Sequence, residues 1–238
     1  MGKILLIASG KGGVGKTTLS TNFGVVLAKQ GLKVIIVDMN VGLRNDDIYL
    51  GLEDRILFDF GDVSSGLCKL EKAIVKHDMC DKLELLSCPQ NRGIDGLTTG
   101  HTRALYAKLR KEYDYVIVDL PTINGDNLQY FGTGADEALI VLNQDYVSVR
   151  NGDGINRQLA SMGIARRWYI VNKVFEESFT RSGLPDMLFI ERNIDAQCLG
   201  YIPFDLSIDM ANNSGVPVVF EEDAPAAKTI KEIALRLL

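Results

Sequence analysis

The chain has 238 residues, of which 46% are hydrophobic and 24% are charged, a composition typical of a globular protein with one substantial core. Its formal net charge of −5 at pH 7 gives no general positive field, so direct binding of nucleic acid is not expected. No signal peptide is visible and no stretch approaches the roughly 18 apolar residues of a spanning helix, which predicts a cytoplasmic protein.

The N-terminal segment joins an apolar strand to a glycine-rich loop. Residues 4–8 form a predicted core strand, and residues 10–17 follow with Gly-x-x-x-x-Gly-Lys-Thr, the Walker A pattern. Glycines let backbone N–H groups turn inward around phosphate oxygens, which a Cβ would obstruct. Apolar residues then recur at helical spacing over 19–27 and stop at Gly31, so a helix N-terminus is expected to face the same anion.

This loop supplies the first predicted ligands. Lys16 is expected to reach the phosphates as a point charge, and the Thr17 hydroxyl is expected to hold Mg²⁺. The predicted phosphate-binding residues are Gly10, Lys11, Gly12, Gly13, Val14, Gly15, Lys16, Thr17 and Thr18. The alternative, an accidental glycine-rich turn, is disfavoured by the flanking strand and helix.

Strand-like runs alternate with helical patterns along the rest of the chain. Strands are predicted at residues 34–37, 83–86, 115–118, 138–142, 168–171 and 199–202. Several of them are continuously apolar, as strands covered on both faces must be. The last segment, 223–238, is a predicted helix with Asp223 as its N-cap. Residues 1–238 are therefore predicted to form a single α/β domain with a doubly wound, mostly parallel sheet and helices on both faces.

Two aspartates stand directly after predicted strands. Ligands of open parallel sheets bind at the carboxyl ends of the strands, where Asp38 and Asp119 are expected to lie. Asp119 has the position of a Walker B aspartate, which holds Mg²⁺ through water. Thr17, Asp38 and Asp119 are thus the predicted metal site, although each aspartate has an alternative role as a strand-end cap.

The sequence resembles the deviant Walker A ATPases of the MinD/ParA family. Lys11 opens the loop as a second lysine in KGGVGKTT, and residues 38–45, DMNVGLRN, are similar to the MinD switch I form D-x-D-x-G-L-R-N. Further matches at 51–55, 135–138, 148–150 and 215–219 extend the resemblance over almost the whole chain. A P-loop NTPase fold that binds ATP or ADP with Mg²⁺ is implied.

The same resemblance implies how such a protein works. In this family the extra lysine reaches the phosphates of a partner subunit, so Lys11 would act in trans within a homodimer that forms on ATP binding. Weak ATP hydrolysis would reopen the dimer, and a protein partner of the cell-division or positioning type is implied. A solvated Lys11 without a partner is the alternative.

The adenine site is also implied by the resemblance. Carried over to this chain, Asn172 and the segment Ile202-Pro203-Phe204-Asp205 would frame the base, which makes Asn172, Pro203 and Asp205 predicted ligands. An apolar slot with one amide that donates and accepts suits a purine edge. Asn172 has an alternative role as a turn residue at a strand end.

Three features depart from the family pattern. Asn40 replaces an aspartate that orients the attacking water in this family. An amide can position water but cannot accept a proton, so a slowed ATPase is expected. The predicted catalytic residues are Lys11, Lys16 and Asn40. Ile123 replaces a switch II glycine, which should reduce backbone freedom. The chain stops at Leu238 without the family's basic amphipathic helix, which leaves attachment to the inner face of the cell membrane open.

Two other functions compete with an ATP-driven dimerisation switch. One is a nucleotide-binding scaffold without turnover, in which Asn40 and Ile123 leave ATP bound as a structural ligand. The other is a small-molecule kinase or ligase, which is disfavoured because no acceptor-binding insertion is evident. The four cysteines contain no C-x-x-C pair, so neither a zinc site nor a shared metal cluster is expected.

Overall fold

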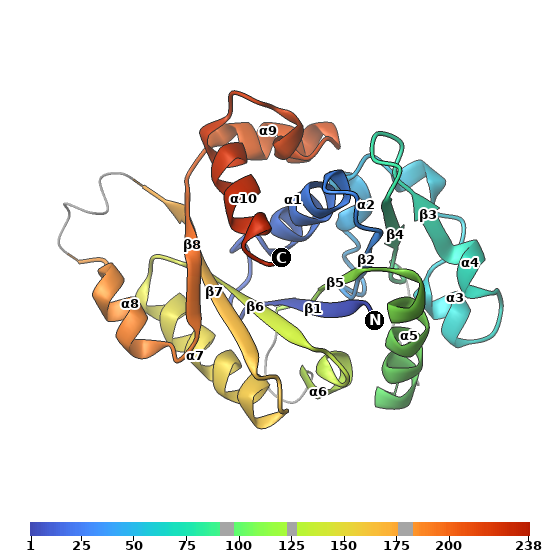
Figure 1. Ribbon diagram of the computed structural model, residues 1–238, viewed down its shortest axis with the longest axis horizontal. Helices are drawn as coiled ribbons and strands as arrows, with labels where there is room; N and C mark the ends of the chain where they lie inside the picture. Colours follow the sequence, from blue (N-terminus) through green and yellow to red (C-terminus); the bar gives the residue numbers. More distant parts are fainter. Residues whose placement is uncertain (91–97, 123–127, 176–182) are drawn as a thin grey trace.

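A computed structural model describes residues 1–90, 98–122, 128–175 and 183–238. Within them, eight strands form one sheet in the order β3-β4-β2-β5-β1-β6-β7-β8 (Figure 1). The strands are β1 Lys3–Ala8, β2 Val34–Asp38, β3 Ile74–Lys76, β4 Leu83–Leu86, β5 Tyr115–Asp119, β6 Glu137–Asn143, β7 Arg166–Val174 and β8 Gln197–Pro203. Among the described strands only the β3–β4 pair is antiparallel, so the prediction of a doubly wound, mostly parallel sheet is confirmed.

Strand bounds differ from the predicted ones where polar residues continue the pairing. β6, β7 and β8 are each longer than predicted, because Glu137, Arg166 and Gln197 still pair with a neighbouring strand. The edge strand β3 was not predicted. It has three residues, Ile74, Val75 and Lys76, which is shorter than the about four to eight residues over which a strand pattern is recognised.

Helices cover both faces of this sheet. They are α1 Lys16–Lys29, α2 Asp46–Tyr49, α3 Phe60–Ser64, α4 Leu70–Ala73, α5 Thr99–Glu112, α6 Leu128–Gly132, α7 Tyr146–Ser161, α8 Met187–Asn193, α9 Leu206–Ser214 and α10 Pro225–Leu235, with the 3₁₀ turns η1 Glu53–Arg55 and η4 Val218–Phe220. α1 and α10 pack on one face, and α5 and α7 on the other (Figure 1). Each face has its own apolar core, which accounts for the continuously buried β2 and β5. In the described ranges, no helix is long and apolar enough to cross a bilayer.

The start of α10 corrects one prediction. Asp223 was the predicted N-cap, but the helix begins at Pro225 after Ala224, which makes no side-chain cap. Asp205, at the start of α9, accepts a hydrogen bond from the Ala226 backbone N–H at 3.1 Å instead. Pro225 supplies the helical φ and lacks an N–H of its own, so a cap from a distant segment is sufficient.

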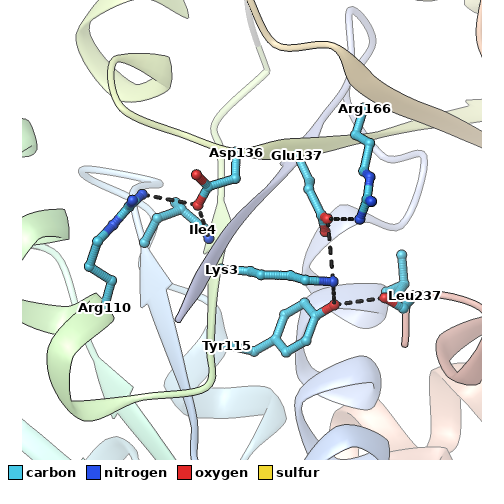
Figure 2. A network of polar contacts seen from close by, with 8 residues as sticks. All are labelled: Lys3, Ile4, Arg110, Tyr115, Asp136, Glu137, Arg166 and Leu237. Carbon is cyan, nitrogen blue, oxygen red and sulfur yellow. Dashed lines mark hydrogen bonds and ion pairs between the residues drawn. The ribbon is translucent and has the colours of Figure 1, made fainter. Parts of the chain in front are cut away.

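Polar contacts fasten the amino ends of the central strands (Figure 2). Glu137 is 2% exposed and lies 2.9 Å from Arg166 and 3.5 Å from Lys3. Lys3 donates to the Tyr115 hydroxyl, which donates to the backbone carbonyl of Leu237 at 2.7 Å. The C-terminal segment is thus tied to the amino end of the sheet, away from the carboxyl ends where ligands of such sheets bind.

The sheet order places a topological switch point at β1. From β1 the chain passes to β2 on one side of β1, whereas from β5 it crosses β1 to reach β6 on the other side. Crossovers on opposite sides leave a crevice at the carboxyl end of β1, the usual ligand site of open α/β sheets. The glycine-rich loop begins at that point.

Candidate nucleotide-binding site

The loop between β1 and α1 has the backbone that its glycines predict. Gly13 and Gly15 have φ values of 71° and 100°, in the left-handed region that favours glycine. A Cβ on Gly15 would overlap the Asn172 side-chain amide. Gly15 is also the N-cap of α1, whose 14 residues begin at Lys16. The first free N–H groups and the positive dipole end of a long helix therefore face the crevice.

Lys16 is a buried cation held at this helix start. It is 8% exposed, and its ammonium group donates to the Ser9 hydroxyl at 3.1 Å. Burial lowers the pKa of Lys16, and the charge of Asp119 acts in the opposite direction. In the described part of the chain, no carboxylate lies within ion-pair distance of Lys16, so its charge is available to an anionic ligand.

The strand-end aspartates meet the loop at one point. Asp38 and Asp119 are opposite each other in the β2–β5 register, and both are fully buried. Thr17 donates its hydroxyl to Asp119 at 2.6 Å, and Ser20 donates to the other oxygen at 3.2 Å. Burial and the charge of Asp38 raise the pKa of Asp119 to about 6. The structure thus brings together the residues predicted for the metal site, Thr17, Asp38 and Asp119.

Asn40 lies between these two carboxylates as a donor. Its side-chain N–H₂ donates to Asp119 at 2.6 Å and to Asp38 at 3.0 Å, and its backbone N–H donates to Asp38 at 2.7 Å. The amide therefore separates two like charges that would otherwise face each other. Ile123, the other switch residue singled out from the sequence, lies outside the described residues.

A third buried carboxylate was missed by the sequence analysis. Asp46 is the first residue of α2, and one of its oxygens lies within 4.8 Å of an oxygen of Asp38 and of Asp119. Burial and the charges of both aspartates raise the pKa of Asp46 well above its usual value. Acidic residues are common in the first turn of any helix, so the sequence carries no signal that separates Asp46 from an exposed one.

A pocket of about 420 Å³ opens in front of the loop. Its volume is within the usual range for small-molecule sites. The residues that line it are Gly12, Gly13, Gly15, Lys16, Thr17, Thr18, Asn40, Leu43, Asn45, Tyr49, Pro121, Thr122, Asn172, Lys173, Pro203, Phe204, Asp205, Ile208, Asp209 and Asn212. Tyr49, Lys173 and Asn212 were not predicted, since no motif marks them.

The predicted adenine residues all line this pocket. Asn172 donates to the backbone carbonyl of Val14 at 2.8 Å, and its own side-chain oxygen is buried without a donor from the described residues. Pro203 and Asp205 line the pocket as well. The Asp205 carboxylate caps two helices through Ser207 and Ala226, so it contributes shape to the pocket more than a free acceptor. Burial acts to raise the pKa of Asp205, but hydrogen bonds from Ser207 and Ala226 outweigh it and lower the pKa.

Lys11 is turned away from the pocket of its own chain. Its ammonium group lies 2.6 Å from the Asp145 carboxylate, which also caps α7 by accepting from the Ser148 N–H. Both partners of the pair are about one-third exposed. Gly12 and Gly13 beside Lys11 are exposed as well, so this side of the loop is open to another molecule.

A phosphate-binding loop at the switch point of a parallel sheet, with a strand-end aspartate hydrogen-bonded to its threonine, defines a P-loop nucleotide-binding protein. Residues 5–218 match the family described as the CobQ/CobB/MinD/ParA nucleotide binding domain. The septum site-determining protein MinD of Synechocystis sp. is 36% identical over 225 residues, covering 93% of this chain and 84% of that protein. MinD of Bacillus subtilis is 33% identical over 242 residues, covering 100% of this chain and 90% of that protein.

A solved structure of similar sequence has the same fold. The structure is of the MinC:MinD cell division protein complex of Aquifex aeolicus, with a TM-score of 0.91 and 36% identity over 99% of this chain and 95% of that chain. The chain therefore belongs to the MinD group of the MinD/ParA family, as the sequence resemblance predicted.

Proposed function

We propose that this protein is a MinD-like ATPase that dimerises when Mg-ATP is bound and acts in selecting the site of cell division. The meeting of loop and strand ends supports this most: Thr17 lies 2.6 Å from Asp119, next to Lys16, in a pocket of about 420 Å³. The MinD relatives are septum site-determining proteins, and the Aquifex MinD was solved in a complex with MinC. A cell-division protein is therefore the partner that we expect.

The described residues suit a magnesium nucleotide. Lys16 and the loop amides would hold the phosphates, and the Asn172 side-chain oxygen would accept from an adenine amine. Thr17, Asp38 and Asp119 would hold Mg²⁺, because hard cations prefer hydroxyl and carboxylate oxygens. When bound, Mg²⁺ neutralises charge on the phosphates.

Replacing Asn40 with aspartate should speed ATP turnover. In this chain the Asn40 amide donates to Asp119 and cannot take a proton from the attacking water. We expect a steady-state rate at least about threefold higher in Asn40→Asp, since a well-placed base contributes about hundredfold or more. Phosphate release measured with Mg-ATP tests this, with Asn193→Asp, at the end of α8, as a control. An unchanged rate would show that Asn40 is not part of the hydrolytic machinery.

The contacts of Asn40 also favour a second function, a scaffold that keeps ATP bound. The amide donates to both Asp38 and Asp119, which holds the side chains of the predicted metal site together without providing a base. A single-turnover measurement separates the two functions. Loss of the γ-phosphate within minutes supports the ATPase, and ATP that stays intact for hours supports the scaffold.

Magnesium-dependent nucleotide binding should weaken at acid pH. Mg²⁺ and a proton compete for Asp119, whose pKa is raised to about 6, so affinity is full above that pH and falls as the pH decreases through it. Between about pH 7 and pH 5, the Mg²⁺ concentration for half-maximal ADP binding should rise by about tenfold. Fluorescence titration with labelled ADP measures it. Parallel titrations without Mg²⁺ correct for protonation of the nucleotide, and an equal Mg²⁺ requirement at both pH values would contradict the assignment of Asp119.

A further inference from the structure

Asp46 is a buried carboxylate that has no role in the proposed nucleotide and Mg²⁺ contacts. Its side chain is fully buried, and neither of its oxygens has a hydrogen-bond donor among the described residues. One of its oxygens lies within 4.8 Å of an oxygen of Asp38 and of Asp119. A buried carboxylate without donor or cation is costly, so its orientation toward two further carboxylates indicates a positively charged ligand between them.

The start of α2 is fixed in this position by the end of β2. Asp38 accepts hydrogen bonds from the backbone N–H groups of Asn45 at 3.1 Å and Asp46 at 3.4 Å. Leu50, which follows α2, is packed in the core. The backbone of Asp46 is therefore held beside the end of β2, and its fully buried side chain lies in the interior.

No positive side chain in the described ranges compensates the three carboxylates. Arg44 lies two residues before Asp46, but its guanidinium is 2.7 Å from Asp47. Lys16 donates to Ser9, and no described lysine or arginine is within ion-pair distance of Asp38, Asp46 or Asp119. A bound cation would balance the charge of these three carboxylates.

A third carboxylate is significant at this site because Asn40 contributes no negative charge. The amide occupies the place between Asp38 and Asp119 and brings donors instead of negative charge. Asp46 approaches the same two side chains from another element and brings back one negative charge. The metal site thus has three carboxylates, from Asp38, Asp46 and Asp119, although Asn40 supplies none.

We propose that Asp46 is a third carboxylate ligand of the divalent cation at the Thr17, Asp38 and Asp119 site, bound directly or through water, and that it replaces the charge absent at Asn40. The inference rests on the proposed function, because the cation is the one that accompanies the nucleotide. Mg²⁺ takes carboxylate, hydroxyl and water oxygens, which Asp38, Asp46, Asp119 and Thr17 supply together. Asp46 would fix the cation, and the loop would fix the phosphates.

The test measures cation affinity and not turnover. Mn²⁺ is titrated into the protein with saturating ADP, and free Mn²⁺ is counted by electron paramagnetic resonance. Asp46→Asn keeps the side-chain shape, and we expect it to weaken Mn²⁺ binding by about tenfold, because one full charge close to the cation is lost. In the double variant Asn40→Asp with Asp46→Asn, affinity should return to within about threefold of the parent. Asp47→Asn is the matched control, since Asp47 is equally buried but paired with Arg44.

Two further measurements keep the outcomes distinct. Asp46→Asn should melt at a higher temperature than the parent without metal, because a buried like charge is removed, so misfolding would be detected directly. Equal Mn²⁺ affinity in parent and variant would overturn the inference, and would mean that Asp46 only shares a proton with its neighbours. Binding of ADP in EDTA tests the nucleotide site alone. If the parent binds no ADP, the proposed function fails, and a Mn²⁺ titration without nucleotide still tests Asp46.

Discussion

Replacing Lys16 with methionine should abolish nucleotide binding at micromolar concentration. Lys16 lies at the N-terminus of α1 with its ammonium group buried and, among described residues, without a carboxylate within ion-pair distance. Hydrogen bonds from a charged donor to phosphate contribute about 1.5–3 kcal/mol each, and Lys16 can provide more than one. We therefore expect the Kd for Mg-ATP to rise at least about a hundredfold, measured by isothermal titration calorimetry.

The expected loss is specific to the charge at the loop. Methionine keeps most of the buried stem, and removal of a desolvated cation should leave the melting temperature without ligand unchanged or higher. Lys108→Met is the matched control, because Lys108 is an exposed lysine on α5, outside the residues that line the pocket. Binding of Mg-ATP by Lys16→Met at the affinity of the parent would show that the loop is not the phosphate site.

Short sequence patterns predicted the parts of the site that lie within one segment of the chain. The loop, its glycine conformations and the following helix depend on residues within one segment, so Gly13, Gly15 and Lys16 could be placed from spacing alone. Asp38 and Asp119 could be expected to meet, because adjacent parallel strands end at the same edge. The rule needs only the order of strands and not the contacts between side chains.

Other parts depend on tertiary contacts that no local pattern encodes. Asp46 resembles any acidic residue in a first helical turn until Asp38 fixes α2 beside it. Asp205 caps α10 from a segment that lies 20 residues earlier, so Asp223 was the better choice on sequence alone, yet it was wrong. The pair of Lys11 with Asp145 joins residues that are 134 positions apart. In each case the partner is chosen by the assembled sheet.

Replacing Lys11 with alanine should abolish the ATP-dependent dimer and leave nucleotide binding to the monomer nearly unchanged. Lys11 does not line the pocket of its own chain, so its loss removes no contact to the nucleotide there. In the proposed dimer each Lys11 would reach the partner's phosphates, and two charge-assisted contacts would be lost together. The dimer dissociation constant should increase at least about a hundredfold. Gel filtration with light scattering measures it in Mg-ATP and in Mg-ADP, with Lys108→Ala as a control.

Because Lys11 is paired with Asp145, removing the Asp145 charge should strengthen the dimer, whereas removing Lys11 should weaken it. If Lys11 must leave Asp145 to reach a partner, then Asp145→Asn should favour the dimer, because the amide oxygen still caps α7 while the ion pair is lost. A partly exposed pair contributes about 0.2–1 kcal/mol, so the dimer should form at an about 1.4- to fivefold lower concentration for each lysine released. A solvated Lys11 without a role in trans predicts no change in either variant. Weaker dimerisation in Lys11→Ala together with stronger dimerisation in Asp145→Asn would identify the ion pair as the contact that is exchanged for the partner's phosphates.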